Sequence, residues 1–236
     1  MTNRRSLGAR LATLVAATIV ATALAGCTAA GQAAPAPTLL SSPSPTSTPT
    51  AAPVTAAAIG DSIAIGNGVP AEDAWPLLVA DRFGWTLSDF AESAAGFTVK
   101  GLNTHTFDDQ VSAVIRLRPD VVLIGGTRND VFASTEGLKA AATAALQRLR
   151  TALPHARIIG VGPLWGSDQP PAQIAVIDKT VKEAVLDVGG SWVELGQPFT
   201  GHPELVLSDH VHPTVAGQRM LADTIADHIA SQFVLR

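Results

Sequence analysis

The chain has 236 residues, of which 47% are hydrophobic, so it is long enough for one domain of ordinary size with some additional segments. Its net charge of -4 is spread along the sequence, without the basic run of a nucleic-acid-binding protein or an acidic tail. The single cysteine, Cys27, excludes an intrachain disulfide.

Residues 1–26 have the pattern of an export signal. Three arginines precede an apolar run from Leu11 to Ala25. This run is shorter than the roughly 20 residues that a membrane-spanning helix needs. The tetrad Leu24-Ala25-Gly26-Cys27 resembles the lipobox of bacterial lipoproteins, which implies cleavage before Cys27 and its modification with diacylglycerol. The protein would then be anchored to the extracytoplasmic face of the cell membrane. An ordinary secretory signal is the alternative, and the Sec and Tat export routes both stay open.

Residues 27–53 are predicted to form an extended linker. Between Thr28 and Ala56 there is no charged or aromatic residue, and six prolines lie among Ser, Thr and Ala. Such a segment cannot bury enough apolar surface to offset the entropy lost on ordering. It is expected to act as a tether or, if its Ser and Thr residues are glycosylated, as a stalk.

From residue 54 to residue 236 the pattern predicts one domain in which strands and helices alternate. The expected strands are 54–59, 86–91, 121–125, 157–161 and 191–193. The expected helices are 73–83, 107–117, 135–153, 172–188 and 215–233. The third strand is wholly apolar, as in a sheet covered on both faces. This order predicts an α/β fold, a three-layer α/β/α sandwich with a parallel sheet.

The first strand ends in Gly60-Asp61-Ser62, and functional residues of open parallel sheets gather beyond the carboxyl ends of strands. A serine at this edge becomes a nucleophile when a base takes its proton. The position of Ala64 excludes the G-x-S-x-G elbow of α/β-hydrolases. A simple turn or helix cap is the alternative for this tripeptide.

Two further strand ends carry candidate oxyanion donors. Gly96 follows the second strand, where a glycine can let a backbone N–H point into a site, and Gly101 close by is the alternative. Asn129 follows the third strand and could offer its side-chain amide to a developing oxyanion. The alternative for Asn129 is a glycine-rich turn in which Asn129 and Asp130 cap the next helix.

The segment from Ser208 to Pro213 contains Asp209 and His212, and Pro213 is expected at the first position of the last helix. A carboxylate three residues before a histidine can reach Nδ1–H and leave Nε2 to face a serine. A zinc site formed by Asp209, His210 and His212 is the alternative. No other His or Cys cluster completes such a site, so neither a metal nor another cofactor is predicted.

These residues, in this order, resemble the GDSL/SGNH hydrolase family, named for its Ser, Gly, Asn and His blocks. The resemblance implies a flavodoxin-like fold and ester hydrolysis without a metal. Ser62 would be the nucleophile, His212 the general base and acid, and Asp209 the residue that orients it. The oxyanion hole would consist of the N–H groups of Ser62 and Gly96 and the side chain of Asn129. The family block usually has one residue between its glycine and asparagine, whereas this chain has two.

The sequence therefore predicts a serine esterase that acts on a lipid or an acylated cell-envelope glycan, with no nucleic-acid partner. An O-acyltransferase that uses the same residues and a non-catalytic lipoprotein that binds envelope polysaccharide are the alternatives. Trp165 lies past the fourth strand, where it either lines the pocket or packs as loop core. Arg128 is expected to face solvent or an anionic part of the substrate. Activity is expected to fall when acid protonates the histidine base.

Overall fold

The computed structural model describes residues 52–234. The predicted signal peptide, the predicted acylation site Cys27 and nearly all of the predicted linker lie outside these residues. Each predicted strand and helix is present, with ends within two residues of the expected bounds. The strands are β1 (Thr55–Ile59), β2 (Thr86–Asp89), β3 (Val121–Ile124), β4 (Arg157–Val161) and β5 (Ser191–Val193). The α-helices are α1 (Trp75–Phe83), α2 (Phe107–Leu117), α3 (Thr135–Ala152), α4 (Ala172–Asp187) and α5 (Val215–Val234).

The five strands form one parallel sheet in the order β2-β1-β3-β4-β5. From β1 the chain proceeds to β2 on one side and then crosses back to β3 on the other side. The direction of winding therefore reverses between β1 and β3, and ligand sites of open α/β sheets lie at such switch points. This topology confirms the predicted α/β fold.

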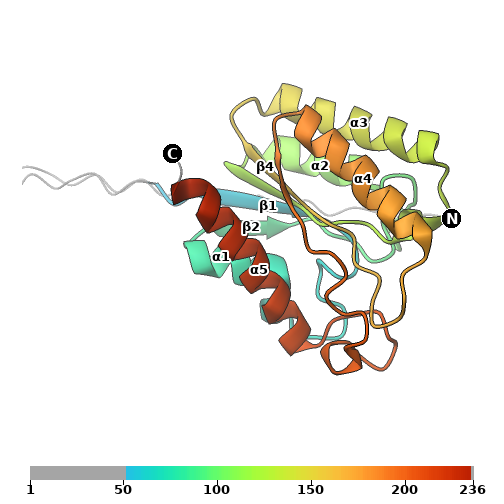
Figure 1. Cartoon of the computed structure of the whole chain (residues 1–236). Coiled ribbons are helices and arrows are strands. Elements are labelled where there is room, and N and C mark those ends of the chain that lie inside the picture. Colours follow the sequence, from blue (N-terminus) through green and yellow to red (C-terminus); the bar gives the residue numbers. More distant parts are fainter. Residues whose placement is uncertain (1–51, 235–236) are drawn as a thin grey trace, which may run out of the picture. The chain divides into compact units, whose positions relative to one another are not determined.

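Helices cover both faces of the sheet, with α1 and α5 on one face and α2, α3 and α4 on the other (Figure 1). The central strand β3 is buried along its whole length. Val122 and Ile124 enter the hydrophobic cluster beneath α2, α3 and α4, whereas Val121 and Leu123 enter the cluster beneath α1 and α5. Because successive side chains of a strand point to opposite faces, one short strand supports two cores.

The position of Pro213 differs from the prediction, although α5 begins at the expected residue. The helix begins at Val215, and the hydroxyl of Thr214 caps it by accepting from the N–H of Gly217 at 3.3 Å. Pro213 lies before this cap and forms an isolated antiparallel bridge with Val206. The placement of Pro213 at the first helical position was therefore wrong, because a hydroxyl cap and a loop bridge occupy this stretch.

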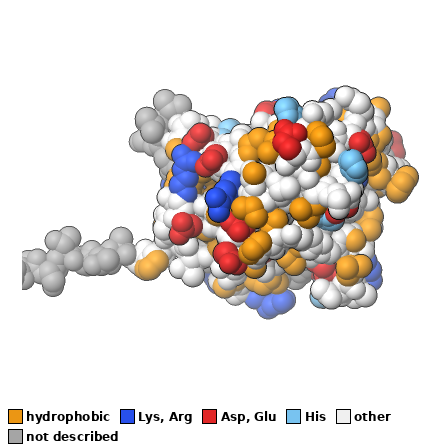
Figure 2. Space-filling model, turned by 90° about the horizontal axis from the view of Figure 1, so that it is seen from below, with side chains coloured by type: hydrophobic (Ala, Val, Ile, Leu, Met, Phe, Trp, Pro, Cys, Tyr) orange, Lys and Arg blue, Asp and Glu red, His pale blue; other side chains and the backbone are white. Residues whose placement is uncertain are grey.

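The surface over α1 and α5 carries both signs of charge. In Figure 2, Lys and Arg side chains lie beside Asp and Glu side chains, with hydrophobic side chains scattered among them. Arg82 of α1, for example, forms ion pairs with Asp223 and Asp227 of α5. In the described part of the chain, no helix combines the length and the apolar character needed to cross a membrane.

Candidate active site

Ser62 lies in a series of turns that follows β1. The N–H of Ile65 donates to the carbonyl of Asp61, and the N–H of Asn67 donates to the carbonyl of Ser62. Within residues 52–234, the backbone N–H of Ser62 itself donates to no acceptor. This N–H is therefore available to an incoming group beside the serine hydroxyl.

Two buried glutamines hold the turn on either side of Ser62. Gln110 of α2 accepts from the N–H of Gly60 at 2.9 Å and donates to its carbonyl at 3.0 Å. Gln218 of α5 donates to the carbonyl of Ile63 and accepts from the N–H of Trp75, both at 3.0 Å. Because α2 and α5 lie on opposite faces of the sheet, the turn is attached to both helical layers.

His212 and Asp209 lie beside the serine. His212 Nε2 is 2.9 Å from Ser62 Oγ, and His212 Nδ1 is 2.7 Å from Asp209 Oδ2. The other carboxylate oxygen of Asp209 accepts from the N–H groups of Val211 and His212 at 2.9 and 3.0 Å. Partial burial acts to raise the pKa of Asp209, but these hydrogen bonds and the nearby His212 lower it to about 2. Asp209 is therefore a carboxylate whenever the histidine can act as a base.

Asp61, next to Ser62, is fully buried, unlike Asp209, and its pKa shifts in the opposite direction. Burial raises this pKa to about 6, against the effect of N–H groups of Ile63 and Arg128 and of the charges of Arg128 and His212. The carboxylate accepts from Ile63 N–H at 2.9 Å, which closes the turn that begins after β1. Asp61 therefore shapes the turn that contains Ser62.

Asn129 begins a short 3₁₀ helix, Asn129–Phe132, directly after β3. Its Nδ2 donates to the carbonyl of Ala95 at 2.8 Å and lies 3.4 Å from Asp61 Oδ2. The extra residue in this block is accommodated because Thr127 is fully buried while the Arg128 side chain extends toward Trp165. Asn129 thus lies between Asp61, which precedes Ser62, and Ala95, which precedes Gly96.

The loop around Gly96 is held by a buried carboxylate. Asp130 accepts from the N–H groups of Phe97 and Thr98, both at 2.8 Å, and from the Thr98 hydroxyl at 2.5 Å. A Cβ at position 96 would lie only 2.6 Å from Asp130 Oδ2, so the approach requires glycine. Asp130 therefore supports the neighbouring loop and does not cap a helix. The N–H of Gly96 donates to the carbonyl of Val99 at 2.9 Å and is not free in this structure.

Arg128 and Trp165 pack together at the β4 side of the site. The guanidinium lies 4.0 Å from the centroid of the Trp165 ring and donates to the Trp165 carbonyl. Burial lowers the pKa of Arg128, and the charges of Asp61 and Asp209 oppose this shift. Arg128 is therefore a half-buried residue near the triad and not the solvent-facing arginine that the sequence left open.

His210 takes part in a different contact. Its Nδ1 is 3.1 Å from Ser167 Oγ, and its backbone adopts a positive φ of 61°. Within residues 52–234, no group of three or more His, Cys, Asp or Glu side chains is placed so that it could hold a metal ion.

The sequence did not single out Gln110, Gln218 or Glu92. Glu92 is buried and accepts from the His105 ring at 2.8 Å and from the N–H of Asn103 at 2.5 Å, which orders the second half of the loop around Gly96. A polar residue on the buried face of a predicted helix is the one signal that could have identified Gln110 and Gln218. No comparable signal distinguishes Glu92.

The sequence model of the GDSL-like lipase/acylhydrolase family matches residues 58–220. A GDSL lipase of Mycobacterium tuberculosis is 28% identical over 192 residues, which cover 75% of this chain and 82% of that protein.

Two solved structures share the fold. One is the psychrotrophic esterase EstA from Pseudoalteromonas sp., inhibited by monoethylphosphonate. It has a TM-score of 0.61 and 16% identity, with 76% of this chain and 98% of that chain covered. The other is a family two carbohydrate esterase from Clostridium thermocellum in complex with cellohexaose. It has a TM-score of 0.63 and 19% identity, with 76% of this chain and 64% of that chain covered. The family match and the α/β fold together establish that this chain belongs to the GDSL-like lipase/acylhydrolase family of esterases and lipases.

Proposed function

We propose that the protein hydrolyses a carboxylic ester through an acyl-enzyme formed on Ser62. One observation carries this proposal: the Ser62 hydroxyl, the His212 ring and the Asp209 carboxylate form a continuous chain of hydrogen bonds. Ser62 and His212 are 150 residues apart in the sequence, so the contact is a product of the fold. Nucleophile, base and orienting carboxylate in this geometry are the components of nucleophilic acyl transfer.

In the first half of the reaction, His212 Nε2 takes the proton of Ser62 Oγ as this oxygen attacks the ester carbonyl. Asp209 holds the ring by its Nδ1–H and stabilises the imidazolium that forms. The tetrahedral intermediate collapses, and the leaving alkoxide takes the proton from His212. Water then gives a proton to the same nitrogen and attacks the acyl group. When the second intermediate collapses, the proton returns to Ser62 and the acid is released.

The oxyanion is assigned to three donors. The N–H of Ser62 has no acceptor among the described residues. Asn129 Nδ2 donates one hydrogen to the carbonyl of Ala95 and the other, over 3.4 Å, to Asp61 Oδ2, so the long bond to Asp61 is the one that is exchanged for the oxyanion. The N–H of Gly96 becomes the third donor when it exchanges the carbonyl of Val99 for the oxyanion. Donors aligned before the reaction stabilise the charge that develops in the transition state.

The substrate is proposed to be a lipid or an acylated glycan of the cell envelope. The relative from M. tuberculosis is named a lipase, and the neighbour from C. thermocellum is a carbohydrate esterase bound to cellohexaose. Both names are compatible with one ester-cleaving centre whose surrounding loops differ. We favour short acyl groups, because residues 54–236 contain no long apolar segment that could act as a lid.

The test is hydrolysis of p-nitrophenyl esters of graded chain length, with Ser62→Ala and His212→Ala variants as comparisons. Each variant is expected to lose at least about 10⁴-fold in kcat. A fluorophosphonate is expected to label the wild type and not Ser62→Ala; the phosphonate-inhibited EstA structure makes this class of probe suitable. Addition of a sugar as acceptor distinguishes the two reactions, because hydrolysis gives the free acid whereas acyl transfer gives the acylated sugar. A folded wild type that is inert on every ester and unlabelled would overturn the proposal.

We also infer that the protein is tethered by a lipid on Cys27 at the extracytoplasmic face of the cell membrane. This inference depends on the lipobox-like tetrad and the signal pattern before it. Expression in a bacterium supplied with labelled palmitate should give a labelled protein, and Cys27→Ala should abolish the label. Equal labelling of both chains would contradict the inference.

A further inference from the structure

The carboxyl edge of the sheet carries exposed apolar side chains on three neighbouring loops. Leu102 follows β2, Ile65 follows β1 and Phe132 follows β3, and these three strands are adjacent in the sheet. Phe132 is 97% exposed, Leu102 77% and Ile65 39%. We call these three residues the apolar rim. Because Ser62 follows β1 and Asn129 follows β3, the rim lies on the loops that form the candidate active site.

The two most exposed rim residues lie on ordered loops. The N–H of Leu102 donates to the carbonyl of Ser93 at 3.0 Å, and the next N–H, that of Asn103, donates to the buried carboxylate of Glu92. Phe132 belongs to the 3₁₀ helix that contains the fully buried Asp130. Buried carboxylates therefore hold in place the backbone that exposes Leu102 and Phe132. Single exposed apolar residues are common on protein surfaces, but a group of them at one edge of a domain marks a contact surface.

Charge at the rim favours an anionic surface. The segments 62–69, 93–105 and 127–134 carry Lys100 and Arg128, and they contain no exposed carboxylate, because Asp130 is buried. The exposed charge nearest the apolar rim is therefore that of Lys100, since Arg128 is half-buried against Trp165. The exposed carboxylates nearest these segments are Asp89 at the end of β2 and four residues where the following helices begin. These four are Glu72, Asp108, Asp109 and Glu136.

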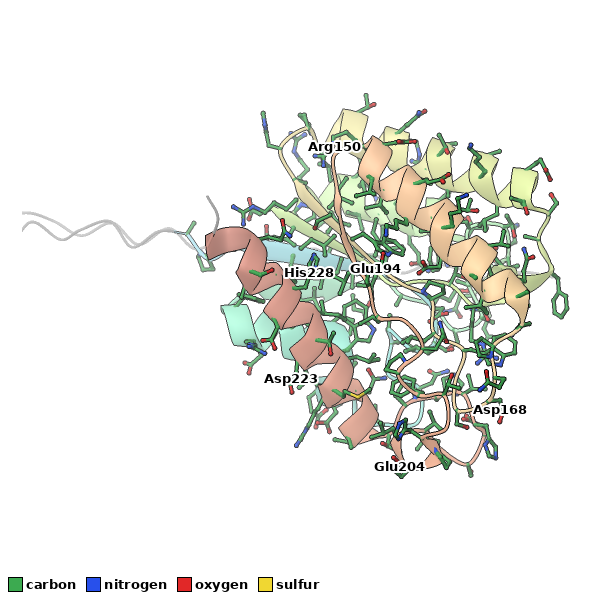
Figure 3. All side chains as sticks on the ribbon, in the orientation of Figure 1. Arg150, Asp168, Glu194, Glu204, Asp223 and His228 are labelled. Atoms are coloured by element: carbon green, nitrogen blue, oxygen red, sulfur yellow. The ribbon has the colours of Figure 1, made fainter. Side chains whose placement is uncertain are left out.

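The other half of the same edge is acidic. Figure 3 shows Asp168 and Glu204 on loops at the end of the domain that lies away from Arg150. Both are exposed. Asp168 belongs to the loop that follows β4, and Glu204 to the segment after β5 that also contains Asp209. An approaching anionic surface would therefore meet the β2-β1-β3 side of the edge first.

The geometry points to a phospholipid bilayer with anionic headgroups as the partner of the apolar rim. A second copy of the chain fits less well, since a stable protein interface buries about 800 Å² on each partner and three separate side chains cannot supply it. A bilayer needs no complementary shape, because each apolar side chain can enter the acyl region on its own while basic residues contact the headgroups. Docking in this way would bring the entrance of the site to the level of the membrane lipids.

The tether proposed above is long enough for this orientation. The chain enters the domain at the amino end of β1, the edge opposite the rim. Residues 27–53 can span at most about 90 Å when fully extended. A domain of this size is roughly 40 Å across, so a lipid on Cys27 does not prevent the rim from reaching the same membrane.

The test is co-sedimentation of the chain from Thr28 onward, without lipid and with Ser62→Ala to prevent hydrolysis, with phosphatidylcholine vesicles that contain or lack phosphatidylglycerol. Binding is expected mainly with phosphatidylglycerol. Leu102→Ser combined with Phe132→Ser should lower the partition coefficient at least about tenfold. Lys100→Gln should weaken binding to the anionic vesicles alone. The matched control is Leu117→Ser combined with Leu186→Ser, since these half-exposed leucines end α2 and α4 at the opposite edge and should leave binding unchanged.

Loss of vesicle binding must be separated from loss of catalysis or of a protein contact. With Ser62 intact, the rim variant is expected to hydrolyse soluble p-nitrophenyl acetate at the wild-type rate. No binding by the wild type, equal binding by the rim variant, or equal loss in the control pair would overturn the inference. A rim variant that changes the oligomeric state in light scattering would identify a protein interface instead.

Discussion

At the scale of single residues, Asp61 makes stability depend on pH. Its pKa is raised to about 6 by burial, above the value of about 3.9 for an unfolded aspartate. Folding therefore favours the protonated carboxyl, so its contribution to stability is fully present below about pH 4 and is lost as the pH rises through 6. Relative to Asp61→Asn, the free energy of unfolding of the wild type should fall by about 2 kcal/mol between pH 4 and pH 7.5.

Urea unfolding at several pH values measures this difference. Asp81→Asn, which replaces an exposed carboxylate on α1, is the matched control and should show no such trend. If the difference between wild type and Asp61→Asn is the same at every pH, Asp61 does not titrate with a raised pKa.

Asp130 offers a second prediction at this scale. It accepts three hydrogen bonds from Phe97 and Thr98, and Asn in its place would turn an amide N–H toward at least one of these donors. Asp130→Asn is expected to cost about 1–3 kcal/mol of stability. It should also lower kcat, because the loop that carries Gly96 loses its support. Thr98→Val removes only the hydroxyl contact and should have a smaller effect in the same urea titrations and ester assays. If Asp130→Asn is destabilised but keeps the wild-type kcat, the support that Asp130 gives to this loop does not contribute to catalysis.

At the scale of elements, Gln110 and Gln218 connect the turn that contains Ser62 to α2 and α5. Leucine in place of Gln110 would leave the buried N–H of Gly60 without a partner and remove one of the two donors to its carbonyl, which keeps the N–H of Glu92, at a cost of about 1–3 kcal/mol. We expect Gln110→Leu and Gln218→Leu each to lower kcat with little change in KM, because the serine is displaced while the substrate surface remains. Gln147→Leu, on the exposed side of α3, is the control. An effect on KM alone in the steady-state kinetics would contradict this positioning role.

The elements themselves were predictable because local signals define them. Pro119 follows the end of α2, where Arg118 adopts a left-handed conformation, and the apolar run of β3 reads as a strand buried on both faces. Asp209 and His212 could be paired because they are three residues apart. Ser62, Asn129 and Gly96 could be placed at one edge because parallel strands end there together. Their roles in catalysis stay predictions until the ester assays are done.

Contacts between distant residues were not predictable in the same way. Gln110 bonds a backbone 50 residues away, and Gln218 bonds one 143 residues away. A glutamine in a helix has no local pattern that names such a partner. The same holds for the N–H of Gly96, which is directed to Val99 by a turn that the sequence alone does not specify. Pro213 was misplaced because the competing Thr214 cap and the bridge to Val206 also depend on tertiary packing.

At the scale of the whole domain, the sheet joins two hydrophobic clusters that helices cover separately. The strands contribute alternate residues to both, as with Ile158 to one cluster and Ile159 to the other. Loss of the sheet would expose both clusters to water at once, so the described domain should unfold in one cooperative step. All four tryptophans of the chain lie after residue 54, and the chain has no tyrosine, so intrinsic fluorescence reports on this domain alone.

Trp75 belongs to the cluster beneath α1 and α5, and Trp192 to the cluster beneath α2, α3 and α4. Variants that keep only one of these two tryptophans, with the others replaced by Phe, report on one cluster each. In urea, the fluorescence midpoint of each variant should coincide with the far-UV circular dichroism midpoint of the same variant, because the sheet couples the two clusters. A fluorescence transition that precedes loss of the dichroism signal in one variant only would show that this helical layer can separate from the sheet. In that case Gln110 or Gln218 would lose its hydrogen bonds to the turn that contains Ser62 before the rest of the domain unfolds.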